Sequence, residues 1–211
     1  MIRHASPNFG PRRDGLTPSL IVLHYTAMSS AAAALERLCD PLAEVSAHYL
    51  IGNDGTLWQL VDEEMRAWHA GAGEWRGQDD INSRSIGIEL DNTGRHPFSE
   101  PQMRALEALL PGIMARWSIA PEGVIGHSCM APGRKADPGE RFDWARLARQ
   151  GLAAMPGTGE VPAGARLRDL ARAAGFTAEA DDETLLAAVR LRYRPWGRGE
   201  VTCDDLRVLQ G

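Results

Sequence analysis

Strand-like and helix-like segments alternate along the first 150 residues, and this alternation restricts the fold more than any other feature of the chain. Ser19–Tyr25 is a short apolar run, rich in β-branched residues and bounded by Pro18, as expected of a buried strand. Ser85–Leu90 is a second strand, with isoleucine and leucine on one face and glycine and glutamate on the other. Between them, Asn53-Asp54-Gly55 separates two apolar runs and predicts a hairpin, because such turns need positive φ. These signals indicate an α/β fold.

Two segments have clear helix signals. Ser29-Ser30 open an alanine-rich run that extends to about Cys39, because serine is a good N-cap. Ser99 begins a longer helix, with Gln102 at the capping-box position and apolar residues at helical spacing after it. Pro111 should kink this helix, because proline cannot donate the backbone hydrogen bond.

The segment that follows is more irregular. Gly123–His127 predicts a short strand, Ser128–Arg141 is too rich in proline and glycine to be regular, and Phe142–Gln150 returns to helix. Together these elements predict a mixed central β-sheet flanked by helices.

A proline- and glycine-rich stretch then interrupts the pattern. Residues 155–164 (MPGTGEVPAG) predict a linker. Beyond it lie three helical stretches, Ala165–Ala174, Asp182–Tyr193 and Thr202–Leu209. We therefore predict a main domain over 1–154, a linker over 155–164 and a three-helix module over 165–211, which is too small to bury a core alone and leans on the main domain.

Composition excludes several classes of protein. The 211 residues carry 23 basic and 28 acidic side chains, a net charge of −5, which argues against a nucleic-acid partner. No segment approaches the ~20 apolar residues that span a bilayer, so no membrane partner is expected. Three scattered cysteines (Cys39, Cys129 and Cys203) do not form a disulfide framework and fit a reducing compartment. The amino terminus lacks the apolar stretch of a secretory signal, which predicts a cytoplasmic protein.

Three residues at the ends of predicted elements could hold a metal ion. His24 ends the first strand, His127 ends the strand before the irregular loop, and Asp137 lies ten residues later in that loop. Two imidazoles and a carboxylate suit a catalytic zinc with a fourth position open to water. From the pattern alone, however, isolated histidines near strand ends are more often structural or surface residues, and no short-spaced zinc motif is present.

A resemblance to a known family favours the metal site over structural or surface histidines. Five fragments occur in this order: Leu23-His24-Tyr25-Thr26-Ala27, Val45-Ser46-Ala47-His48-Tyr49, Ala67-Trp68-His69-Ala70-Gly71, Ser85–Leu90, and Gly126-His127 followed by Ala131–Gly139. Together they resemble the type 2 N-acetylmuramoyl-L-alanine amidases, zinc amidases that include the bacterial anhydro-muramyl-peptide amidases. The resemblance covers about residues 19–150.

The resemblance implies a role for five residues. His24, His127 and Asp137 match the zinc ligands of the family, which implies one Zn²⁺ per chain. Glu89 matches the general base, and Lys135 matches the residue that stabilises the transition state. The chemistry needs these residue types, because zinc supplies hydroxide near neutral pH, a carboxylate moves the proton, and an ammonium meets the oxyanion. Glu89 could instead be a solvated strand residue, but a charged residue beside Gly87 on a strand otherwise made of isoleucine and leucine more often faces a cleft. Without the motif, Lys135 would be interpreted as a surface charge.

Three further residues are predicted to contact substrate: His69, Trp68 and Arg84. Tryptophans are first of all core residues, and this alternative applies to Trp68 and equally to Trp75. His48 precedes an apolar run, so we predict a structural role for it, or a supporting one behind the site.

Two positions bear on the chemistry in other ways. Cys129 lies two residues after His127, but Asp137 already fills the place of the third ligand, so we predict that Cys129 is a spectator. Ala47 stands where some phage-type members carry tyrosine, which leaves proton transfer to Glu89.

These features predict a bacterial zinc hydrolase that cleaves the amide between the lactyl group of N-acetylmuramic acid and L-alanine. Its partners would be muropeptides or peptidoglycan fragments brought into the cytoplasm for recycling. One alternative is a recognition domain that binds such fragments without cutting them, and another is a zinc hydrolase of a different bond. The C-terminal helices resemble a shortened peptidoglycan-binding module, with a plain helical cap as the alternative. The sequence does not indicate an oligomeric state.

Overall fold

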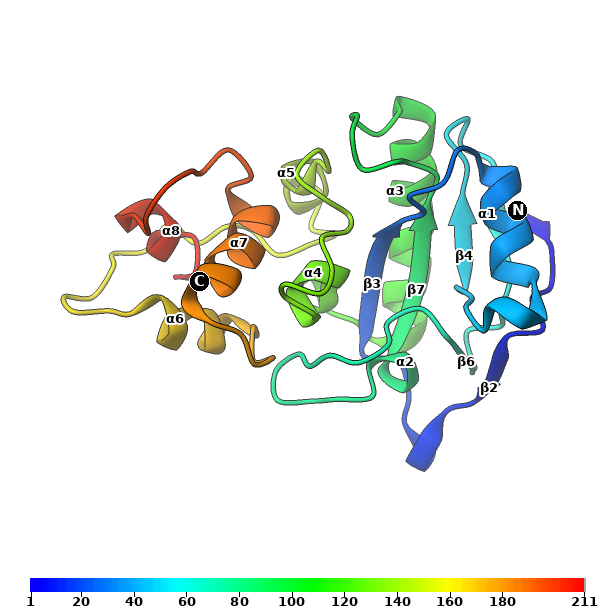
Figure 1. Cartoon of the computed structure of the whole chain (residues 1–211), viewed down its shortest axis with the longest axis horizontal. Coiled ribbons are helices and arrows are strands. Elements are labelled where there is room, and N and C mark those ends of the chain that lie inside the picture. Colours follow the sequence, from blue (N-terminus) through cyan, green and yellow to red (C-terminus); the bar gives the residue numbers. More distant parts are fainter. Residues whose placement is uncertain (211) are drawn as a thin grey trace.

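The computed structural model describes residues 1–210, and Gly211, the last residue of the predicted module, lies outside the described part. A six-stranded mixed sheet forms the centre of the molecule, as predicted (Figure 1). Its strands, in spatial order, are β1 (Ile2–Arg3), β5 (Leu57–Gln59), β4 (Tyr49–Ile51), β7 (Ser85–Leu90), β3 (Leu20–Tyr25) and β8 (Val124–Gly126). β3 pairs in parallel with β7 and β8, whereas β4 and β5 form the predicted antiparallel hairpin. A separate antiparallel pair joins β2 (Phe9–Pro11) to β6 (Met65–Ala67).

The two faces of β3 explain the layers on either side of the sheet. Ile21 and Leu23 point to one face, where they pack with Leu106 and Leu110 of α3 (Glu100–Trp117). Val22 points to the other face and belongs to a cluster that includes apolar residues of the C-terminal helices. His24 follows Val22 in the same alternation, so the fold directs it toward the second face.

Helix α3 begins as predicted but differs in detail. The Ser99 side chain accepts a hydrogen bond from the backbone N–H of Gln102. A full capping box requires the Gln102 side chain to accept a hydrogen bond from the backbone N–H of Ser99, and it does not do so. Instead it donates to the carbonyls of Ile51 and Asp91, because this side chain is fully buried beside the sheet. The helix continues through Pro111 to Trp117.

Short helices are where the sequence-based assignment was incomplete. The predicted irregular loop begins with helix α4 (His127–Met130), and α2 (Ile81–Arg84) was not predicted at all. Each has four residues and no side-chain N-cap hydrogen bond, so neither produces a helical repeat in the sequence. The remaining helices of this half, α1 (Ala31–Cys39) and α5 (Trp144–Arg149), lie within the segments predicted for them.

The C-terminal segment forms the three predicted helices, α6 (Leu167–Ala174), α7 (Asp182–Tyr193) and α8 (Cys203–Arg207). They gather at one end of the molecule, beyond α4 and α5 (Figure 1). One apolar cluster contains residues of both halves, among them Val22, Met130, Leu185 and Val189. At the same junction, the Arg192 guanidinium stacks on the Trp144 ring at 4.0 Å and donates to the carbonyl of Ala154. The module therefore shares a core with the sheet. No helix within residues 1–210 is long and apolar enough to cross a membrane.

Candidate metal centre and active site

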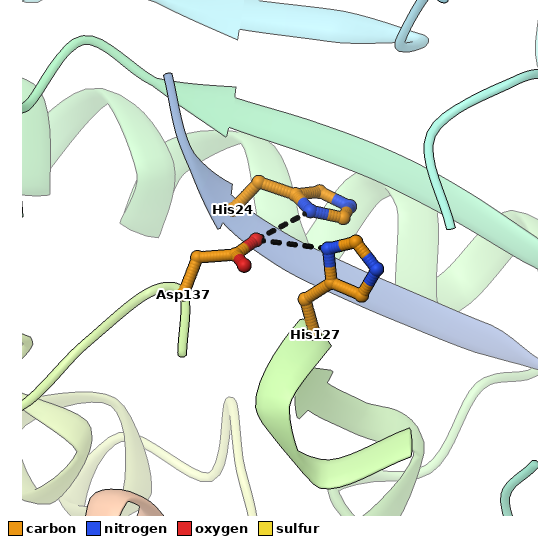
Figure 2. A group of neighbouring side chains, drawn as sticks. All are labelled: His24, His127 and Asp137. Atoms are coloured by element: carbon orange, nitrogen blue, oxygen red, sulfur yellow. Dashed lines mark hydrogen bonds and ion pairs between the residues drawn. The ribbon is translucent and has the colours of Figure 1, made fainter. Parts of the chain in front are cut away.

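His24, His127 and Asp137 meet at the carboxyl ends of two neighbouring parallel strands. His24 is the fifth residue of β3, His127 directly follows β8, and Asp137 comes from the loop after α4. Oδ2 of Asp137 lies 2.8 Å from Nδ1 of His24 and 3.0 Å from Nδ1 of His127 (Figure 2). One ligand atom from each residue falls within 4.8 Å of the others, and the side chains are 2%, 2% and 7% exposed.

The donor set fits a divalent metal ion. The Nε2–H of His127 donates to the carbonyl of Ala70, so its Nδ1 carries a lone pair directed at Asp137. Burial lowers the pKa of His24 to about 4, which keeps this imidazole neutral near pH 7. Imidazole nitrogens and a carboxylate oxygen that converge in this way are typical zinc ligands.

Glu89 lies beside this group on the sheet. It is paired with His24 across the β3–β7 ladder, and it lines the same cavity. Its Oε2 is buried and has no hydrogen-bond partner in the described part of the chain. Burial, together with the charge of Asp137, raises the pKa of Glu89 to about 8. A carboxylate of this kind, aimed into a cavity and tuned toward neutral pH, is suited to general acid and base chemistry.

A cavity of about 660 Å³ opens over the three ligands and Glu89. Trp68, His69 and Lys135, three of the residues singled out from sequence, line it. Two further cations, Arg37 of α1 and Arg134, also line the cavity. Neither was assigned a role from the sequence: Arg37 lies outside the matched fragments, and Arg134 lies within Ala131–Gly139 but is not one of the residues with a role in the family. The walls therefore present positive charge outside the metal-binding group, which favours an acidic ligand.

Four of the other residues considered from sequence lie elsewhere or serve the fold. Arg84, predicted to contact substrate, ends α2 at the amino end of β7, does not line the cavity, and donates to the carbonyl of Asp79. Trp75 is buried against Phe176 of the module, so it is a core residue. Cys129 is buried in the shared apolar cluster and is not part of the metal-binding group. The predicted supporting role of His48 fits its contacts, because its Nδ1 accepts from the backbone N–H of Gly87.

His69 does more than line the cavity, because both of its ring nitrogens contact other side chains. Its Nδ1 lies 3.0 Å from Nε2 of His24 and its Nε2 lies 3.3 Å from the Ser85 hydroxyl. Burial, and then the neighbouring His24, lower the pKa of His69 well below its ordinary value, so the ring is neutral. The partners on its far side, Ser85 and Asn82, gave no signal in the sequence, since buried serine and asparagine are not distinguishable there from surface ones.

Comparison with known proteins places this geometry in a family. The family model described as N-acetylmuramoyl-L-alanine amidase matches residues 14–140. The chain is 42% identical over 153 residues to the N-acetylmuramoyl-L-alanine amidase AmiD of Escherichia coli, a match that covers 65% of this chain but only 54% of that relative. It is 35% identical over 162 residues to the 1,6-anhydro-N-acetylmuramyl-L-alanine amidase AmpD of Citrobacter freundii, covering 69% of this chain and 87% of that one.

Solved structures agree over a longer stretch. The complex of Escherichia coli AmiD with the substrate anhydro-N-acetylmuramic acid-L-Ala-D-gamma-Glu-L-Lys superposes with a TM-score of 0.81 at 34% identity, covering 93% of this chain and 89% of that one. AmpDh3 of Pseudomonas aeruginosa in complex with anhydromuramic pentapeptide gives 0.82 at 30% identity, covering 98% and 93%. Because both matches cover more than nine tenths of the chain, they extend into the C-terminal helices.

Proposed function

Because the chain belongs to the N-acetylmuramoyl-L-alanine amidase family, we propose that it hydrolyses the amide between the lactyl group of N-acetylmuramic acid and L-alanine in peptidoglycan fragments. One observation carries this proposal. The ligand atoms of His24, His127 and Asp137 converge in a cavity that also holds the unpartnered carboxyl oxygen of Glu89. That combination supplies a metal site and a proton carrier at the same place, which a purely structural histidine cluster does not require.

We infer that the metal is zinc, one ion per chain. When bound, zinc would supply a Lewis acid that makes hydroxide available near neutral pH and polarises the attacked carbonyl. Nδ1 of both histidines and Oδ2 of Asp137 would hold it. The open cavity above them leaves room for water and substrate.

Glu89 and Lys135 carry out the proton transfer and the stabilisation of the oxyanion. Glu89 Oε2 takes the proton of the attacking water and later returns it to the amine of L-alanine as the amide breaks. Burial raises the pKa of Glu89 toward neutral pH, which suits both halves of this exchange. Lys135, on the rim of the cavity, places its ammonium against the developing oxyanion, a contribution worth about 3 kcal/mol in comparable sites.

The substrate class follows from the cavity and from the relatives. AmiD and AmpDh3 bind anhydromuropeptides in their solved complexes. Stem peptides carry free carboxylates, and the walls around this site offer Arg37, Arg134 and Lys135. We therefore propose soluble muropeptides, including 1,6-anhydro forms, as substrates. We propose a role in cell-wall recycling in the cytoplasm of a bacterium, which this substrate class supports.

The domain assignment remains a proposal of the same kind. Residues 1–154 would carry the amidase, 155–164 the linker and 165–211 a helical module that resembles a shortened peptidoglycan-binding domain. The shared apolar cluster supports a module that is held against the amidase by its core.

A digest followed by mass spectrometry tests the amidase. The purified protein, with and without a chelator, is incubated with anhydro- and reducing-end muropeptides, alongside Glu89→Gln. Glu64→Gln is the matched control, because Glu64 is exposed and outside the cavity. Chelator-sensitive release of the intact L-alanyl peptide, lost in Glu89→Gln and kept in Glu64→Gln, is expected. Binding without release at full zinc occupancy would leave a recognition domain, and release of a shorter peptide would indicate a different bond.

A further inference from the structure

A chain of hydrogen bonds leads from the backbone of α2 to the metal ligand His24. The Ser85 hydroxyl lies 2.5 Å from the carbonyl oxygen of Ile81 and 3.3 Å from Nε2 of His69. Nδ1 of His69 lies 3.0 Å from Nε2 of His24. Ser85 is fully buried, so water does not compete for its hydroxyl.

The direction of every bond in this chain follows from its first acceptor when each imidazole ring carries one proton. A carbonyl oxygen only accepts, so the single hydroxyl proton of Ser85 is used on Ile81. Ser85 Oγ then offers His69 a lone pair, which requires Nε2 of His69 to donate and leaves Nδ1 of the neutral ring as an acceptor. His24 must therefore donate from Nε2. Its lone pair is left on Nδ1, the atom that faces Asp137.

Ala70, the residue after His69, fixes the tautomer of His127 in the same way. The carbonyl of Ala70 accepts the Nε2–H of His127 at 2.8 Å, which leaves the lone pair of His127 on Nδ1. Both backbone N–H groups of this two-residue segment donate to Oδ1 of Asn82, at 3.0 and 2.8 Å. One short segment, fixed from behind by one asparagine, thus supplies the acceptors for both histidines.

We propose that His69–Ala70 is a positioning element that sets the tautomer and the orientation of both histidine ligands, with His69 acting through His24 rather than through substrate. The inference rests on the proposed zinc site. Partners behind a ligand of this kind fix the ring and raise its basicity, and their loss costs 10- to 100-fold in metal affinity in comparable sites.

Zinc affinity measured without substrate tests the proposal. The metal-free full-length protein is titrated with zinc in competition with a chromophoric chelator. His69→Phe keeps the size of the ring and removes the acceptor, so the Kd for zinc should rise about 10- to 100-fold. His69→Asn keeps an acceptor near the position of Nδ1 and should recover most of the affinity. His4→Phe, a change to an exposed histidine outside the cavity, should leave the Kd unchanged.

The tautomer gives a second readout, independent of any variant. In ¹⁵N NMR spectra of the zinc-loaded wild type, His24 and His127 should each carry their proton on Nε2, and His69 should be neutral and protonated on Nε2. A His24 protonated on Nδ1 overturns the proposal even where His69→Phe does not fold. So does a folded His69→Phe that binds zinc as tightly as the wild type, or a His69→Asn no better than His69→Phe. A wild type that binds no zinc refutes the proposed function and this inference together, whereas unchanged zinc affinity in the variants refutes the inference alone.

Discussion

Gly87 leaves the space that the ring of His69 occupies. A Cβ built on Gly87 would lie 2.4 Å from Cγ of His69, far inside van der Waals contact. The same glycine donates its N–H to Nδ1 of His48, so the strand is held in place from its other side. The absence of a side chain at this point of β7 is therefore a condition for His69 to reach His24.

Gly87→Ala should disturb the metal site through that contact. The added methyl must displace the ring or the strand, a change that costs about 1 to 3 kcal/mol of unfolding free energy. Zinc affinity should fall as well, because the ring that moves is the one bonded to His24. Thermal melting and zinc titration measure the two effects, and Gly10→Ala is a suitable control because its Cβ meets nothing within 4 Å. Unchanged melting and zinc binding would show that the ring and the strand adjust freely.

Glu89 should make the metal-free protein less stable as the pH rises. Its folded pKa of about 8 lies above its ordinary value of 4.5. Below pH 4.5 both the folded and unfolded states hold the proton. Between 4.5 and 8 the unfolded state loses it first, so stability falls by up to about 1.4 kcal/mol per pH unit.

Glu89→Gln removes this dependence. Denaturant unfolding of both proteins with chelator at pH 5, 6, 7 and 8 measures the difference between them, which cancels the contributions of the other titrating groups. The variant should gain stability over the wild type toward pH 8. Parallel curves would mean that Glu89 is ionised in the folded, metal-free protein.

Lys135→Met should slow the reaction without weakening substrate binding to the same degree. If the ammonium meets the oxyanion, its loss should lower kcat by about 100-fold while KM changes little. Steady-state kinetics on a purified anhydromuropeptide separate the two constants. Arg141→Met is the comparison, because Arg141 is an exposed cation beyond the cavity. A rise in KM at constant kcat would instead assign Lys135 to ground-state binding.

Zinc should stabilise the fold, because it binds the folded ligand set and the unfolded chain presents no such site. At a free zinc concentration 100 times the Kd, the expected gain is about 2.7 kcal/mol, or a rise in Tm of several degrees. Asp137→Asn should abolish that gain, since a neutral amide oxygen is a poor substitute for the carboxylate. Calorimetry with and without zinc measures it, and an equal shift in both proteins would place the metal elsewhere.

Arg192 should contribute to stability through packing more than through charge. It is 4% exposed and stacks between the rings of Trp144 and Tyr193. Arg192→Ala leaves a cavity at the junction and should cost about 2 to 4 kcal/mol. Arg192→Met keeps the apolar length and should cost less. Melting temperatures decide the order, with exposed Arg198→Ala as control.

The parts of the fold that were predictable from sequence are those with a repeated pattern. β3 is a short apolar run, β7 alternates isoleucine and leucine with glycine and glutamate, and α3 and α7 are long enough to show helical spacing. α2 directly precedes β7 and α4 directly follows β8, and each has only four residues, which are too few to show helical spacing.

The residues of the site were also predictable only where they belong to a sequence pattern. His24, Glu89, His127, Lys135 and Asp137 were found because they lie within motifs, whereas what orients them was not. The acceptor for His127 is the backbone carbonyl of Ala70, and every residue has a carbonyl. Arg84, predicted to contact substrate, precedes β7, whereas Glu89 lies near the other end of that strand, so the two residues do not share the cavity.

The apolar cluster common to the sheet and the C-terminal helices also bears on how the protein can be cut and rebuilt. A protease that nicks the chain between Ala154 and Ala165 would leave two fragments that stay associated, because Val22, Met130, Leu185 and Val189 remain in contact across the break. Helices α6–α8 grafted onto another protein would carry that apolar side into water. Neither half is therefore a good donor for domain exchange.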